Sequence, residues 1–83
     1  MQTNLSNENN DALVSSLIGR LDKASEIIDS KVQEENRTEF HAQSIVYAAF
    51  LSDYENGVIE KNKDSTEILS LITEFCELVE EFV

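Results

Sequence analysis

The sequence contains no proline and only two glycines, Gly19 and Gly57. Turns are rich in both residues, so their scarcity argues against a β protein, which needs many tight turns. Apolar and polar residues also nowhere alternate for more than a few positions, as they would in half-buried strands. We therefore expect an all-α fold with long helices.

Cysteine and histidine are nearly absent as well, with one of each in the chain, Cys76 and His41. A single cysteine excludes a disulfide within the chain, and the two residues are too small a set for a metal cluster. With 83 residues, the chain is near the size at which burial of apolar surface only just exceeds the entropy lost on folding. Association remains as a source of stability, so we expect a homo-oligomer or a hetero-complex.

Basic residues are also scarce, because six lysines and arginines stand against 17 acidic residues, a net charge of −11. Affinity for nucleic acid depends on basic side chains that neutralise phosphates, so direct binding to nucleic acid is not expected. Anionic membranes are disfavoured for the same reason, and the most apolar stretch, residues 40–54, is too short to span a bilayer. The natural counterpart of this charge is a basic protein surface.

That stretch, Phe40 to Tyr54, has apolar side chains at so many positions that a helix built from it has no fully polar side. A helix that is apolar nearly all round is either central in its own fold or covered by another chain. We therefore expect this stretch to be the core helix, with the rest of the chain covering it.

Amphipathic patterns lie on both sides of this stretch. Apolar residues recur at helical spacing from Leu13 to Val32, with Ile27 off the stripe and expected to be exposed. From Ser65 to Val83 the apolar arc covers about half of the circumference, more than contact with one helix requires. These patterns predict helices near residues 11–34, 38–55 and 65–82.

Turn and cap signals separate the three patterns. The polar run 33–37 fits either a short turn or one continuous helix, and we favour a short turn because a straight rod would leave residues 40–54 uncovered. Gly57 follows the middle stretch, so we expect it to close that helix in the left-handed conformation, with Val58 folding back as an apolar contact. Asp64 and Glu67 have the spacing of a capping box for the third helix.

The chain is expected to form a small antiparallel three-helix bundle, and dimerisation through the middle and last helices is the main alternative. Residues 1–9 are polar, and we expect a mobile tail there followed by one helical domain over residues 10–83. The start of the sequence shows no basic residues followed by an apolar run, so no secretory signal is predicted and a cytoplasmic protein is expected.

The sequence offers no recognisable catalytic constellation. No nucleophile stands at a known spacing from His41, and Cys76 lies in the apolar arc of the last helix, where a buried, inert thiol is expected. The acidic residues between positions 53 and 64 do not match the ligand positions of a calcium loop. We therefore expect no enzymatic activity, no cofactor and no metal.

Two features predict a surface for a partner. Tyrosines combine an apolar ring with a polar end and are favoured at interfaces, and small residues beside them let another helix come close. Glutamates on the last helix add an acidic face. The predicted partner-binding residues are Phe40, Ser44, Tyr47, Ala48, Leu51, Tyr54, Glu67, Glu74, Glu77 and Glu81.

These features predict a non-enzymatic, acidic helical module that covers a basic, partly apolar site on a partner protein. It would act as an inhibitor, an antitoxin-like or immunity-like protein, or a small chaperone subunit. The alternative is a nucleic-acid mimic that blocks a DNA- or RNA-binding protein, such as a defence nuclease or nucleoid protein. Carboxylates three to four residues apart on a helix lie about 5 to 6 Å from each other, close to the spacing of phosphates along a strand. An acidic face also serves solubility alone.

Overall fold

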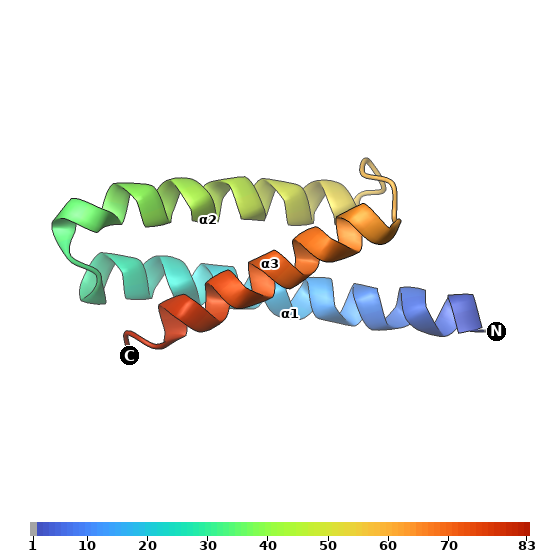
Figure 1. The fold of residues 1–83 in the computed structure, drawn as a ribbon, viewed down its shortest axis with the longest axis horizontal. Coiled ribbons are helices and arrows are strands. Elements are labelled where there is room, and N and C mark those ends of the chain that lie inside the picture. Colours follow the sequence, from blue (N-terminus) through green and yellow to red (C-terminus); the bar gives the residue numbers. More distant parts are fainter. Residues whose placement is uncertain (1) are drawn as a thin grey trace.

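The computed structural model consists of three α-helices, α1 (Gln2–Lys31), α2 (Glu34–Glu55) and α3 (Lys63–Glu80) (Figure 1). It describes the backbone of residues 2–83 and the side chains of residues 10–83, and this part contains no strand. α2 runs antiparallel to α1, and α3 crosses in front of α1 obliquely (Figure 1). The predicted all-α three-helix bundle is therefore confirmed.

The helix boundaries differ most from the predicted ones at the start of the chain. α1 begins at Gln2 instead of near residue 11. The predicted mobile tail covers residues 1–9, whose side chains lie outside the described part. Only Val32 and Gln33 join α1 to α2, so the predicted turn is present and is shorter than the polar run suggested.

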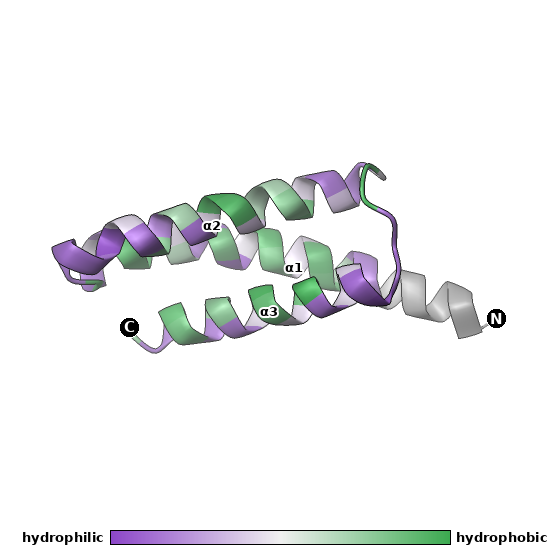
Figure 2. Cartoon of the chain, turned by 45° about the horizontal axis from the view of Figure 1, so that its top comes forward, coloured by the Kyte–Doolittle hydropathy of each residue, from purple (hydrophilic) through white to green (hydrophobic). Residues whose placement is uncertain are grey.

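α1 is the central element of the fold. It packs closely against both α2 and α3, whereas α3 starts near the end of α2 and diverges from it (Figure 1). The apolar turns of the described part of α1 and of α2 lie in the middle of the molecule, and hydrophilic residues gather at the connections (Figure 2). The fully or almost fully buried apolar side chains of α1 are Val14, Leu17, Leu21, Ala24, Ile27 and Ile28.

The prediction that Phe40–Tyr54 forms the core helix is wrong. Within this stretch only Leu51 and Tyr54 are buried apolar side chains, and several other apolar positions face solvent. A helix in contact with two neighbours needs a wide apolar arc. α1 has that arc because Ile27, predicted to be exposed, is buried beside Val79 of α3.

Tyr54 is the largest fully buried side chain of the core. Its ring packs with Leu17 and Leu51 and with the apolar face of α3. Its hydroxyl accepts a hydrogen bond from Asn10 Nδ2 at 3.3 Å. A buried polar group without a partner is costly, so this bond lets a tyrosine occupy the interior.

The connection between α2 and α3 begins as the sequence predicts. Gly57 has a φ of 78°, a left-handed conformation that favours glycine, and the Val58 amide donates to the Asp53 carbonyl at 2.9 Å. The Val58 side chain is 72% exposed, so the predicted apolar contact is wrong. Ile59 packs against the core in its place.

α3 starts with a capping box formed by Asn62 and Ser65. The Ser65 amide donates to Asn62 Oδ1 at 3.0 Å, and the Asn62 amide donates to Ser65 Oγ at 2.9 Å. The predicted box of Asp64 and Glu67 is therefore wrong by two positions. Asparagine accepts from the first turn as well as aspartate does, so residue preference alone does not separate these two registers.

Replacement of the cap should weaken the start of α3. We expect Asn62→Ala to lower the free energy of unfolding by about 1 kcal/mol, because the Ser65 amide loses its acceptor. Urea unfolding followed by circular dichroism measures this loss. The matched control is Asn36→Ala, an exposed position in the first turn of α2, which should be neutral or slightly stabilising. Equal losses in both variants would contradict the assigned cap.

Two neighbouring residues of α3 should respond differently to truncation. Ile72 is fully buried, so Ile72→Ala should lower the free energy of unfolding by about 2 to 5 kcal/mol. Leu71 faces solvent, and Leu71→Ala should cost about 0.5 kcal/mol or less. Urea unfolding of the two variants at one temperature checks this difference. A larger loss of stability for Leu71→Ala than for Ile72→Ala would show that the opposite face of α3 packs on α1.

Candidate protein-interaction surface

The structure buries three of the predicted partner-binding residues. Ser44, Leu51 and Tyr54 are almost inaccessible, and Leu51 and Tyr54 belong to the core cluster between the helices. They point at α1 because α1 is the central helix. These three residues are therefore unavailable to a partner that docks on the folded chain, and their assignment to its surface is corrected.

Ala48 is exposed at the edge of the contact between α1 and α2. Together with Ser52 and Glu55 it lines a hollow of about 230 Å³, which Ile18 and Asp22 of α1 border on the other side. The residues that line this hollow come from α1 and α2, and none comes from α3. The predicted set therefore does not form one surface.

Phe40 and Tyr47 lie on the side of α2 that faces α3, and both are half-buried. The ring of Phe75 in α3 is 6.1 Å from that of Phe40 and 5.5 Å from that of Tyr47, measured between centroids. Phe82 adds an edge contact with Phe40 at 5.9 Å. Since α2 and α3 diverge, these large rings are what spans the space between them.

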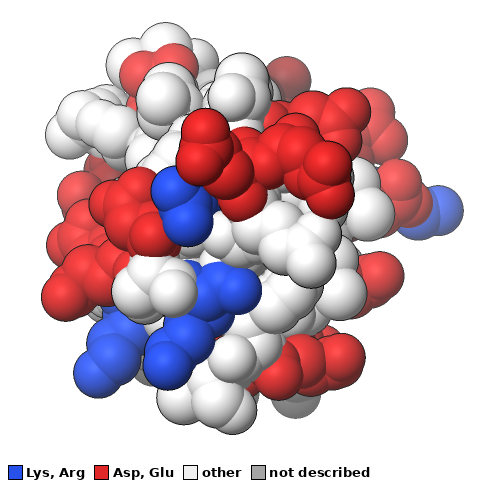
Figure 3. Space-filling view, turned by 90° about the vertical axis from the view of Figure 1, so that its left-hand side faces the viewer, with Lys and Arg blue, Asp and Glu red and all other residues white. Residues whose placement is uncertain are grey.

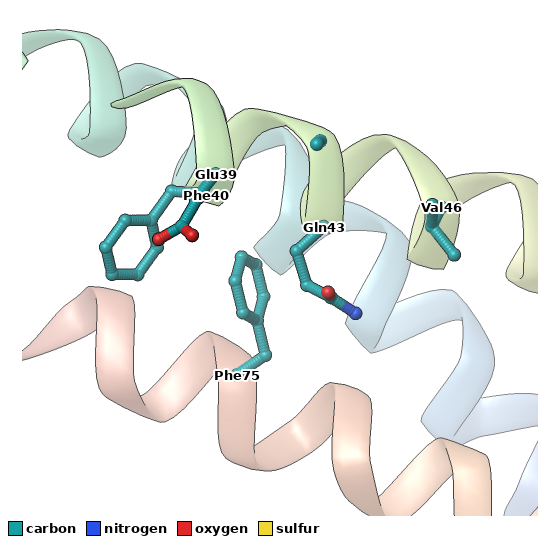
Figure 4. A pocket seen from close by; sticks show the side chains of 6 residues that line it. Glu39, Phe40, Gln43, Val46 and Phe75 are labelled. Carbon is teal, nitrogen blue, oxygen red and sulfur yellow. The ribbon is translucent and has the colours of Figure 1, made fainter. Parts of the chain in front are cut away.

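An open groove lies over these rings. Figure 4 shows Phe40 and Phe75 pointing into the space between the two helices, with Glu39, Gln43 and Val46 along the α2 side. The hollow has a volume of about 460 Å³. Its walls come from α2 and α3, and we refer to it below as the α2–α3 groove.

Apolar side chains continue the groove along both helices. On α3, Leu71 and Leu78 are 51% and 49% exposed and stand four and three residues from Phe75 on the same side. On α2, Val46 is 61% exposed. Prediction from sequence missed these three residues as site residues. The signal was present, since the apolar arc of the third helix is wider than one helix contact requires.

Acidic side chains stand along the groove on both helices. Glu67, Glu74 and Glu81 are exposed and recur every seven residues, so they form one row on α3 next to Leu71 and Leu78. Glu77, also exposed, lies farther round the helix. On α2, the exposed Glu39 and Asp53 stand seven residues before and after Val46 and share its row, and Glu39 lines the groove itself. We call these two sets the acidic rims.

The basic side chains do not neutralise the rims. Among the residues with described side chains, the ion pairs join Arg20 to Glu80, His41 to Asp29 and Lys61 to Asp11. None of these involves a rim residue. Viewed from the end at which α1 turns into α2, acidic side chains occupy several sides, and most of the basic ones gather in one corner (Figure 3).

His41 and Cys76 are the two candidate reactive residues in the sequence. His41 Nε2 lies 2.7 Å from Asp29 Oδ1, and this pair has no nucleophile in it. Cys76 is fully buried in the core, and that burial raises the pKa of its thiol. No group of three or more potential metal ligands gathers among residues 10–83.

No family model matches this chain, and neither does any curated protein or solved structure to which it was compared. Within the described part, no helix combines the length and the apolar character that a membrane span needs.

The thiol of Cys76 should react only when the protein opens. Thiolate is the reactive form, and burial both raises the pKa and blocks access. We expect an aromatic disulfide reagent at pH 8 to label the folded chain at a rate that rises with the unfolded fraction as urea is added. The urea-unfolded chain, which should react at once, is the control. Rapid and complete labelling of the folded chain would contradict the buried position.

Proposed function

We propose that this chain is a non-enzymatic binding module that covers a basic, partly apolar site on a partner protein. The α2–α3 groove carries this proposal, because its apolar floor is open to solvent between two acidic rims. Such a protein acts in stoichiometric amounts, as an inhibitor, an antitoxin-like or immunity-like protein, or a small chaperone subunit.

Burial of the groove would supply affinity. Full burial of a leucine or valine side chain contributes about 1.5 to 3 kcal/mol relative to leaving it exposed. Val46, Leu71 and Leu78 are each roughly half exposed or more, so each has about 1 kcal/mol left to gain from a partner. Exposed apolar patches framed by polar residues are typical of interaction sites.

The acidic rims would make binding selective for basic partners and would speed association. Their carboxylates add to a net charge of −11, which attracts a basic surface over distances of about 10 Å at moderate salt. Complementary charge raises the rate of encounter and disfavours acidic partners. The proposed partner therefore presents lysines and arginines around an apolar centre.

The nucleic-acid mimic has weaker support. The close carboxylate spacing that it needs would come from Glu74, Glu77 and Glu81, and Glu77 lies outside the row that the other two share. Within that row the residues are seven apart, about 10 Å along the axis at 1.5 Å per residue. A mimic also has no use for the apolar groove.

Substitution of the groove should abolish binding while leaving the fold intact. We expect Leu71→Gln/Leu78→Gln to lose the partner that the wild-type chain captures from native lysate. Glutamine is as good a helix former as leucine and leaves the net charge unchanged. The matched control is Val58→Gln, another exposed apolar position, which lies outside the groove and should retain the partner. Mass spectrometry of the captured proteins provides the readout.

The same capture separates the two functions. For the proposed module, Glu74→Gln/Glu77→Gln/Glu81→Gln should weaken capture only in part, and DNA should compete poorly. The nucleic-acid mimic would be favoured by three results together. The triple variant would lose the partner, DNA would displace the partner, and Leu71→Gln/Leu78→Gln would still capture it. Failure of the wild-type chain to capture any protein, together with a monomeric mass in solution, would contradict both.

A further inference from the structure

We infer that the occupant of the α2–α3 groove is a single basic amphipathic α-helix of the partner protein. This inference rests on the proposed function and specifies the chemistry of the segment that binds. The helix would lie along the groove, over the rings of Phe40 and Phe75, and complete a four-helix arrangement.

The walls of the groove favour a helix over an extended peptide. An extended peptide gains most of its affinity by adding to the edge of a sheet, and residues 2–83 contain no strand. The groove is instead bounded by α2 and α3, whose exposed side chains form the ridges and gaps into which another helix packs. Ala42 and Ala49 stand beside Val46 on α2 and are exposed, so a third backbone can come close there.

The spacing on α3 sets the register of the occupant. Leu71, Phe75, Leu78 and Phe82 repeat at four, three and four residues, which is the pattern of a helix that packs along its length on another helix. An occupant with apolar residues at the same alternating spacing of three and four would place its side chains between them. Its apolar stripe would thus be narrow, about two positions in seven.

The acidic rims set the charges that flank this stripe. The row of Glu67, Glu74 and Glu81 repeats every seven residues, the period of the apolar pattern beside it. On the α2 side, Glu39 and Asp53 stand fourteen positions apart. A helix seated between the rims would therefore carry lysine or arginine on both sides of its stripe, repeating once in about seven residues.

Charge argues against a second copy of this chain as the occupant. Two copies related by a twofold axis would bring the same face of each together. The rim of Glu67, Glu74 and Glu81 would then meet the rim of the other copy or an equally acidic α2. Each copy also carries a net charge of −11, and like charges placed opposite each other disfavour an interface.

Designed peptides test the inference on the full chain. The probe is a helical peptide about three heptads long, with leucines on one stripe and lysines on both flanks. Its control has the same composition with leucines and lysines spread around the helix. The chain, labelled with ¹⁵N, is titrated with each peptide, and its amide signals report the site and the affinity. We expect the amphipathic peptide alone to bind, with the largest shifts near Val46, Leu71 and Leu78.

Two variants refine the readout. Leu71→Gln/Leu78→Gln and Glu67→Gln/Glu74→Gln/Glu81→Gln should each weaken the peptide at least about tenfold. The charge-matched control Asp22→Asn/Glu26→Gln/Glu60→Gln, which removes three exposed carboxylates outside the groove, and Val58→Gln should leave the affinity within about twofold.

Each other outcome overturns the inference in a distinct way. Equal binding of the control peptide would reduce recognition to charge alone, and shifts confined to α1 or to the far side of α2 would place the site elsewhere. The peptide could also fail to bind while capture from lysate still depends on the groove, so that Val58→Gln keeps the partner and Leu71→Gln/Leu78→Gln loses it. That result would exclude a helix as the occupant and leave the proposed function standing. Self-association that Leu71→Gln/Leu78→Gln abolishes would identify a second copy as the occupant.

Discussion

α1 packs between two neighbours, and this packing determines where α2 and α3 lie. A helix that contacts α2 on one side and α3 on the other uses apolar residues over a wide arc, and Ile27 extends that arc to the α3 side. Both neighbours are thus packed mainly on α1, and they share its core through Leu51 and Tyr54 of α2 and the buried face of α3. A space between α2 and α3 follows directly from this arrangement.

Aromatic side chains fill the space between α2 and α3 only in part. The rings of Phe40, Tyr47, Phe75 and Phe82 reach across it and contact one another, which joins the two outer helices through their longest apolar side chains. Over the rings the groove stays open, and the glutamate row beside it repels other acidic molecules. The three helices thus share one core, and apolar side chains of α2 and α3 still face solvent beside the groove.

Sequence patterns predicted the type of the helices and the left-handed Gly57, because each depends on local periodicity or backbone geometry. Local composition alone did not separate the short first turn from one continuous helix. The patterns did not predict which helix is central. Phe40–Tyr54 is apolar all round, and periodicity does not show whether Val46 or Leu51 faces the core. The site was predicted in part for the same reason: Phe40 and Tyr47 border the groove, Tyr54 is buried, and Leu71 and Leu78 became site residues only once α3 had a defined orientation on α1.

Photo-cross-linking from a position beside the groove shows whether a partner binds on this surface. A photoreactive phenylalanine derivative is placed at position 78 of the full chain, and the same derivative at position 58 serves as the control. Irradiation in native lysate should join position 78 to a lysine-rich or arginine-rich helical segment of one protein, and position 58 should give little product. Products from position 58 alone, or joining position 78 only to another copy of the chain, would contradict binding of a partner protein on this surface.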